Sequence, residues 1–268
     1  MSYETILVGD EGFVRTITLN RPERRNAMTP MMQTELIAAM EEAGTSDCRV
    51  VVLAGAGESF CSGLDLSVLQ AAKEKSAAEH REDATRIAKL FRTLYELPKP
   101  TIAAVQGAAV AGGTGLATIC DFTLAVPGAK FGYTEARIGF VPAVVSAYLR
   151  LQLGDKPARD LLLTGRLFDA AEGYRLGLVN EVVGAEELGA RVRELSEKLA
   201  ANSPSSLSST KKLLAAQNRG WLDAAIALAM EANAAARETA DFSEGVAAFL
   251  EKRKAVWSGA DGAGAKVG

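Results

Sequence analysis

The first half of the chain alternates between two spacings of its apolar residues. The segment "YETILVGDEGFVRTITLN" holds two apolar runs around the turn "GDEG", which predicts a β-hairpin. The runs "RVVVLAGAG", "TIAAV" and "FTLAV" are apolar at consecutive positions, as is typical of strands that are covered on both faces of a sheet. These segments predict a largely buried sheet.

Helical spacing separates the strands. "TPMMQTELIAAMEEAG" has Thr29 as N-cap, Pro30 in the first turn and Gly44 as the predicted stop. From Glu79 to Leu97 apolar residues recur at helical spacing, and "PKP" ends that helix. Strands and helices that alternate up to about residue 155 predict an α/β fold with largely parallel strands.

The strand pattern fades beyond Lys156, where helices and turns are expected. The segment from Trp221 to Arg237 is rich in alanine and apolar around much of its circumference. Such a helix needs cover on several sides, which indicates a subunit interface. The small residues of "SGADGAGAKVG" predict a frayed tail.

Composition and charge narrow the class of protein. With 48% hydrophobic and 24% charged residues among 268, the chain is typical of a folded protein. Its net charge of -3 argues against electrostatic binding of nucleic acid. The sequence shows no apolar run that would span a bilayer, no signal core at the N-terminus and no peroxisomal address in "AKVG". We expect a cytoplasmic protein without a nucleic-acid or membrane partner.

The single histidine limits the available acid–base chemistry. His80 lies in the polar run "KEKSAAEHRED", which predicts a solvated helix position and neither a Ser-His-Asp triad nor a histidine metal site. Cys48, Cys61 and Cys120 have no metal-like spacing, and their odd number does not indicate a disulfide framework. Proton transfer would therefore fall to carboxylates, lysine, tyrosine or cysteine.

The glycine-rich stretch "VAGGTGLATICDF" follows a predicted strand and opens a predicted helix. A phosphate loop would need a lysine that is absent, and a dinucleotide fingerprint counted from Gly113 would need glycine in place of Thr118. Two interpretations remain. The glycines allow close packing of helix and strand, or free amides at the helix N-terminus stabilise an anionic oxygen.

A second glycine turn follows another buried strand, in "GESFCSGLDL". In order, "ESFCSGLDL", "QGAAVAGGTGLATICDF" and "AKFGYTEARIGFVP" resemble the crotonase family, also called the enoyl-CoA hydratase/isomerase superfamily. The resemblance runs from "LNRPERRNAM" to "EGVAAFLEKRKAVW", which is nearly the whole chain. It implies a spiral of β-β-α units over residues 1–195 and a helical region, residues 196–268, that forms a homotrimer or a dimer of trimers. It implies no metal and no bound cofactor, because CoA enters as part of the substrate.

The resemblance assigns a chemical role to both glycine turns. In this family two backbone amides hold the thioester oxygen of an acyl-CoA, and the matching amides here are those of Leu64 and Gly112. Two fixed donors on an enolate oxygen are worth about 3–4 kcal/mol each. The stretch around Gly112 is thus predicted to form half of an oxyanion hole.

The resemblance also implies where CoA lies. Arg24 and Arg25 would attract the CoA phosphates. Taken alone, the "EKRK" segment near the C-terminus is an ordinary solvated helix face. The predicted CoA-binding residues are Glu23, Arg24, Arg25, Ser62, Asp65, Leu66, Phe249 and Lys252.

One carboxylate is the predicted acid–base group. Family hydratases typically use two glutamates; the second is present as Glu135 in "FGYTE", but Gly115 occupies the place of the first. Paired carboxylates hold a water for addition to a 2-enoyl-CoA, whereas shifting a 3-enoyl bond needs one group. A single glutamate can in principle take a proton from a bound water and deliver a proton to C2. Asp121 in "CD" is expected to be structural.

We therefore predict reversible hydration of a 2-enoyl-CoA in fatty-acid or branched-chain acyl-CoA metabolism, with a 3-enoyl to 2-enoyl isomerase that uses Glu135 alone as the alternative. A non-catalytic acyl-CoA binder would need the amides but no acid–base group, and a nicotinamide-dependent enzyme lacks its fingerprint. The segment "VPAVVSAYL" replaces the glycine-rich turn of many hydratases, so positions 143–145 are expected to shape the acyl pocket. Tyr133 and Phe140 either narrow that pocket or simply pack.

Overall fold

A six-stranded sheet lies at the centre of the computed structural model, which describes residues 3–258. Its strand order is β1-β2-β3-β4-β6-β9. The hairpin β1–β2 is antiparallel and the other neighbours are parallel, as the apolar runs predict. The strands are β1 (Ile6–Glu11), β2 (Val14–Leu19), β3 (Val50–Gly55), β4 (Thr101–Val105), β5 (Ala109–Val110), β6 (Phe122–Ala125), β7 (Lys130–Gly132), β8 (Phe168–Asp169) and β9 (Glu181–Val182).

A second, smaller sheet has the order β5-β7-β8. The chain passes repeatedly from a long strand to this smaller layer and then into a helix. After β3 the smaller layer is reached at Cys61, which forms a parallel bridge to Ala109 of β5. The steps β4–β5–α4 and β6–β7–η3 repeat this order. This is the expected spiral of β-β-α units.

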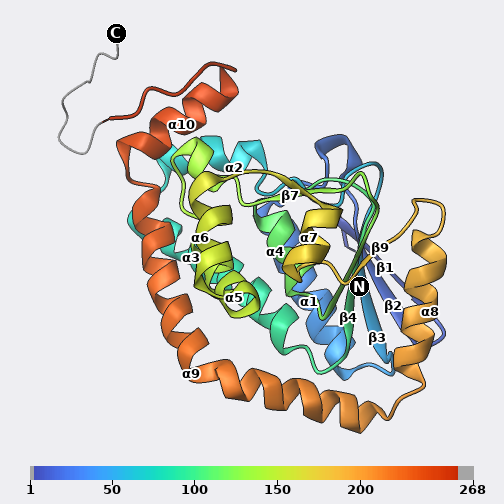
Figure 1. Ribbon diagram of the computed structural model, residues 1–268. Coiled ribbons are helices and arrows are strands. Elements are labelled where there is room, and N and C mark those ends of the chain that lie inside the picture. Colours follow the sequence, from blue (N-terminus) through green and yellow to red (C-terminus); the bar gives the residue numbers. More distant parts are fainter. Residues whose placement is uncertain (1–2, 259–268) are drawn as a thin grey trace.

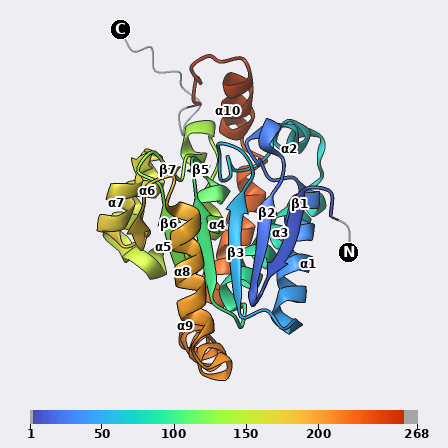
Figure 2. The same ribbon diagram turned by 90° about the vertical axis from the view of Figure 1, so that its right-hand side faces the viewer.

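Helices cover both faces of the large sheet. Helix α8 contacts β3, β4 and β6 on one face, and α1 and α4 lie on the other (Figures 1 and 2). The helices are α1 (Pro30–Thr45), α2 (Leu66–Ala71), α3 (Ala77–Glu96), α4 (Gly112–Ile119), α5 (Ala143–Leu153), α6 (Asp155–Thr164), α7 (Ala170–Leu176), α8 (Leu188–Ala200), α9 (Pro204–Ala236) and α10 (Ala240–Leu250), with 3-10 turns η1 (Pro22–Arg24), η2 (Ala72–Glu74) and η3 (Glu135–Ile138).

The C-terminal region consists of the long helix α9 and the shorter α10. Helix α9 packs along α3 and α5, while α10 packs on η3 (Figure 1). In one chain Trp221 and Leu228 of α9 are 39% and 74% exposed. The predicted division at residue 195 falls inside α8 and, like the subunit interface, stays a prediction. Of the tail predicted to fray, positions 259–268 lie outside the described residues.

Two local predictions are wrong. Gly44 does not end α1, which continues to Thr45, because Gly44 is not among the glycines that adopt a positive φ. His80 is not solvated: its exposed fraction is 3%. Its position on α3, one turn before Ala84 and two turns before Ile87, turns it toward the interior despite its polar neighbours in sequence. Within residues 3–258, no helix combines the length and apolar character needed to cross a membrane.

Candidate active site

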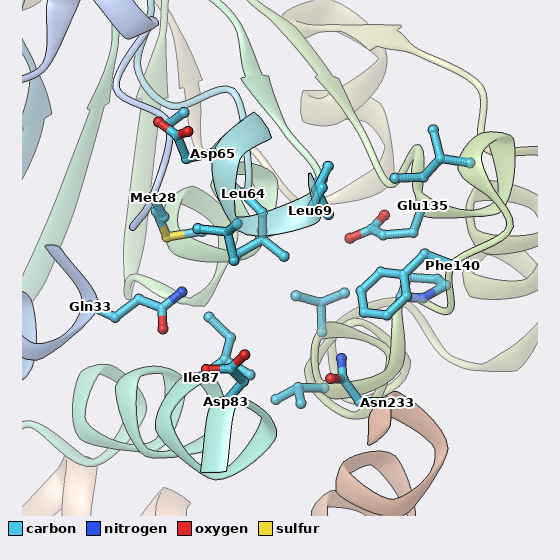
Figure 3. A pocket seen from close by; sticks show the side chains of 18 of the residues that line it. Met28, Gln33, Leu64, Asp65, Leu69, Asp83, Ile87, Glu135, Phe140 and Asn233 are labelled. Atoms are coloured by element: carbon cyan, nitrogen blue, oxygen red, sulfur yellow. The ribbon is translucent and has the colours of Figure 1, made fainter. Parts of the chain in front are cut away.

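A cavity of about 360 Å³ opens where α2, α3, α5 and the end of α9 come together (Figure 3). Most predicted site residues meet there. Glu23 and Lys252 are exposed and lie outside the lining, and Leu66 is the first residue of α2. The predicted residues that line the cavity are Arg24, Arg25, Ser62, Leu64, Asp65, Gly112, Glu135 and Phe249.

The two predicted amides lie in segments that the fold joins. The bridge from Cys61 to Ala109 aligns the segments, and a Cβ placed on Gly63 would lie 3.9 Å from the amide nitrogen of Gly112. Gly112 opens α4, where the first amides lack an intrahelical acceptor. Within residues 3–258 the amides of Leu64 and Gly112 donate no hydrogen bond. Free backbone amides are the type of donor that can stabilise an anionic oxygen.

Local strain and hydrogen bonds fix this geometry. Ala111 has φ 53° and ψ -125°, a conformation that costs a non-glycine residue about 1–3 kcal/mol. Its amide donates to the carbonyl oxygen of Gly132 at 2.7 Å. The Thr114 hydroxyl accepts from the amide of Gly132 at 3.0 Å and donates to the carbonyl of Ala109 at 2.7 Å. Because β5, β7 and α4 all hold this turn, its strained conformation is maintained.

Glu135 supplies the free carboxylate. It begins η3, is 9% exposed and points into the cavity (Figure 3). Its Oε2 has no hydrogen-bond partner within the described residues. Burial raises the pKa of Glu135 to about 7, so both protonation states are accessible near neutral pH. Helix α10 supports this turn closely: a Cβ on Gly139 would lie 2.3 Å from the carbonyl oxygen of Asp241.

Side chains of α3 and α5 crowd position 115. A Cβ on Gly115 would lie 2.6 Å from Cγ1 of Val145 and 3.1 Å from Cζ of Phe91. Ala143 and Val144 line the cavity beside Val145. That this segment shapes an acyl pocket stays a prediction. Apolar side chains thus occupy the position of the first side-chain atom at residue 115, and Val145 or Phe91 would have to shift to admit it.

Phe140, Tyr133 and Asp121 have different surroundings in the structure. Phe140 lines the cavity. Tyr133 is 1% exposed and its hydroxyl pairs with Oγ1 of Thr118 at 3.2 Å, so it packs in the core. Asp121 is structural, as expected: it accepts hydrogen bonds from the amide of Thr101 at 2.7 Å and from Nζ of Lys211 at 2.5 Å.

The sequence analysis did not predict a set of five polar side chains on the side of the cavity formed by α1, α3 and the end of α9. Gln33, Asp83, Arg86, Asn233 and Arg237 all line the cavity. One signal was available, because Asp83 precedes Ile87 by one helical turn and so shares the apolar face of α3. Within the part of the chain that the structure describes, no cluster of histidine, cysteine, aspartate or glutamate could hold a metal ion.

Comparison with known proteins adds to this geometry. Residues 10–260 match the enoyl-CoA hydratase/isomerase family. A Thermus thermophilus relative, assigned by name to the enoyl-CoA hydratases, is 44% identical over 245 residues, which cover 91% of this chain and 97% of the relative. The short-chain-enoyl-CoA hydratase of Clostridium acetobutylicum is 35% identical over 260 residues, with 95% and 97% covered.

Solved structures of enoyl-CoA hydratases have a similar fold. The crystal structure of an enoyl-CoA hydratase/isomerase from Xanthobacter autotrophicus has a TM-score of 0.87 and 31% identity, and the match covers 93% of this chain and 94% of that chain. The chain therefore belongs to the enoyl-CoA hydratase/isomerase family, with the crotonase fold that its motifs predict. It is an enzyme of that hydratase/isomerase class.

Proposed function

We propose that this enzyme adds water reversibly to the double bond of a short 2-enoyl-CoA. The observation that carries the proposal is the buried Glu135 carboxylate, without a hydrogen-bond partner for Oε2 among the described residues, in the same cavity as the free amides of Leu64 and Gly112. The names of relatives support hydration, and the Clostridium acetobutylicum relative is named for short-chain substrates.

In the proposed step the two amides donate to the thioester oxygen. The Glu135 carboxylate accepts a proton from water as the water oxygen bonds to C3. The electron pair of the double bond moves onto the thioester as an enolate, whose charge the amides stabilise. Glu135 then returns its proton to C2, so one carboxyl group carries one proton through both transfers. A pKa near 7 suits both roles at neutral pH.

CoA is proposed to run from the cavity toward η1. Arg24 and Arg25 are exposed at the lining and carry the charge that attracts phosphates. Ser62 and Phe249 also line the cavity, whereas the carboxylate of Asp65 is already bonded to Ser67 and Arg21. Glu23 and Lys252 would contact CoA beyond the lining, and Leu66 at the start of α2 is also proposed to contact it.

A trimeric assembly is part of the proposal. The exposed apolar side chains of the long helix α9 are the observation that favours it. Their burial between subunits would remove apolar surface from water.

Isomerisation of a 3-enoyl-CoA is the second candidate. The apolar wall at Gly115 favours it, because one carboxylate suffices to remove a proton at C2 and return it at C4. Both reactions pass through a thioester enolate. They differ in whether a water lies beside Glu135.

The test incubates purified protein with crotonyl-CoA and follows the absorbance of the conjugated thioester together with product mass. Loss of absorbance with the gain of one water supports hydration. A parallel incubation with 3-hexenoyl-CoA should give little increase in conjugated thioester. No hydration, combined with rapid formation of the conjugated product from 3-hexenoyl-CoA, would overturn hydration in favour of isomerisation. Binding without conversion of either substrate would contradict both.

A further inference from the structure

We propose that this enzyme takes acyl chains that end in a carboxylate, and that Arg237 binds that carboxylate. This inference rests on the proposed function, because it assumes that the acyl chain of a CoA thioester enters the cavity. The residues Gln33, Asp83, Arg86, Asn233 and Arg237 are called the α3–α9 end of the cavity. Gln33, Asp83 and Asn233 lie across the cavity from Leu64 and Leu69 (Figure 3).

Arg237 is the central observation. Its side chain is 3% exposed and lines the cavity, yet its Nη1 has no hydrogen-bond acceptor within the described residues. Among the described residues, the carboxylate oxygen that pairs with Nη1 is Oδ2 of Asp83 at 3.8 Å, beyond hydrogen-bond distance. The guanidinium is held in place by Nε, which donates to Oδ1 of Asn233 at 3.3 Å, and by stacking 5.1 Å over the ring of Phe140.

The charges around Arg237 leave an excess of positive charge. Asp83 is paired with Lys75 at 2.5 Å and with Arg86, in addition to Arg237 at 3.8 Å, so three cations share one carboxylate. Glu238 is exposed, and its charge is screened by solvent. Of the three cations Arg237 alone is buried, and a buried cation without a full charge partner is costly unless an anion binds there.

Within the α3–α9 end the carboxylate and amide oxygens all accept hydrogen bonds, while some of the donors have no acceptor among the described residues. Both oxygens of Asp83 accept from cations, Oδ1 from Arg86 and Oδ2 from Lys75. The amide oxygens of Gln33 and Asn233 accept from Arg86 and Arg237. Nη1 of Arg237 is a buried donor without an acceptor within residues 3–258, and the hydrogen bonds of Gln33 and Asn233 at this end use their oxygens rather than their nitrogens. Donors alone match a carboxylate better than they match a methyl group.

A purely structural role for Arg237 makes a different prediction. If Arg237 only ties the end of α9 to Asp83 of α3, its removal weakens the fold or the binding of every acyl-CoA equally. If it binds the acyl terminus, its removal changes the preference between two chains of the same length. The comparison of matched ligands therefore separates the two roles.

The test measures calorimetric dissociation constants of the full-length protein for saturated acyl-CoA pairs: glutaryl with valeryl, adipoyl with hexanoyl, and suberoyl with octanoyl. None of these can be hydrated, so the test does not require turnover. We expect the carboxylate-ended ligand of at least one pair to bind roughly tenfold tighter, which corresponds to about 1.4 kcal/mol. Methyl-ended ligands that bind as tightly at every length would overturn the proposal.

Variants sharpen this result. Arg237→Met should remove the preference and leave affinity for the methyl-ended partner within about threefold, whereas Arg237→Lys should retain part of the preference. Arg219→Met removes an exposed arginine from α9, the helix that Arg237 caps at its C-terminus. It should change neither the carboxylate preference nor the affinity for the methyl-ended ligand. A preference that survives in Arg237→Met overturns the proposal. If that variant does not fold, the wild-type pairs and Arg237→Lys still decide.

Hydration of crotonyl-CoA is measured on the same preparations. A carboxylate preference without any hydration contradicts the proposed function alone. Hydration without a carboxylate preference contradicts the role of Arg237 alone.

Discussion

Glu135 in η3 and Asp65 before α2 are both buried carboxylates that line the same cavity, but their surroundings differ. Asp65 accepts hydrogen bonds from the amide and hydroxyl of Ser67 at 2.9 and 2.7 Å and from Nη1 of Arg21 at 2.7 Å. Burial alone would raise the pKa of Asp65, but the bonds from Ser67 and Arg21 outweigh burial and lower it. For Glu135, burial dominates and raises the pKa to about 7.

The difference shows that partners, rather than burial, decide what a carboxylate does in this cavity. Asp65 caps α2 and joins it to Arg21, so its charge stabilises the fold. Glu135 has one oxygen without a partner in the described structure, so its burial costs folding free energy. No hydrogen bond from the described residues holds this oxygen in one protonation state, which suits proton transfer. Substitutions that neutralise Glu135 or Asp65 should therefore have different effects on turnover and stability.

Glu135→Gln should have the largest effect. The amide keeps the shape of the side chain but transfers no proton, so turnover of crotonyl-CoA should fall by roughly 10²–10⁴-fold. Steady-state absorbance assays measure the rate, and calorimetry with butyryl-CoA should show unchanged binding. A variant that keeps a tenth or more of the wild-type rate would remove Glu135 from the mechanism.

The stability of the protein should record the raised pKa of Glu135. Its ordinary pKa of 4.5 rises to about 7 in the folded state, so the folded state binds the proton more tightly than the unfolded chain. Below pH 4.5 the residue is protonated in both states; as pH rises toward 7, wild type loses stability relative to Glu135→Gln, by roughly 3 kcal/mol in total.

Urea unfolding of both proteins at fixed concentration, in steps from pH 4.5 to 8, measures that difference. A stability difference that is constant across this range would show that Glu135 has an ordinary pKa. The contrast with Asp65 would then disappear.

The sequence predicts much of this picture because its signals are local. Buried strands, the glycine turns around Leu64 and Gly112, and the position of Glu135 all lie within short motifs, and the smaller sheet joins those motifs. Even the loss of a second carboxylate at Gly115 can be seen in the sequence. The structure adds that Val145 and Phe91 occupy the space.

The α3–α9 end could not be predicted in the same way. It depends on the end of α9 packing beside α3, which places Arg237 near Asp83, and no local pattern specifies that contact. The wrong prediction for His80 has a related cause: its neighbours in sequence are polar, while its helical face is buried. Helical spacing from Ile87 backward is the sequence property that identifies both Asp83 and His80 as inward-facing.

Asp65→Asn should reduce stability and leave proton transfer intact. The variant keeps one cap acceptor but loses the charge that pairs with Arg21, so the free energy of unfolding should fall by about 1–3 kcal/mol. Urea unfolding measures this loss. Asp160→Asn is the control: its exposed pair with Arg166 is worth less than about 1 kcal/mol. Equal losses in the two variants would mean that Asp65 is not the stronger structural carboxylate.

Gly115→Ala tests the wall that leaves Glu135 as the single predicted acid–base group, and its expected effect is the smallest. The new Cβ would lie 2.6 Å from Cγ1 of Val145, a branched side chain with few alternative rotamers, so stability should fall by about 1–2 kcal/mol. Gly220→Ala in α9 meets no atom within 4 Å among the described residues and should gain about 0.5–1 kcal/mol from helix propensity. If urea unfolding shows that Gly115→Ala is as stable as wild type, Val145 and Phe91 can move. The absence of a second glutamate would then reflect the residue at position 115 alone, and Gly115→Glu would become a feasible way to build a two-carboxylate site.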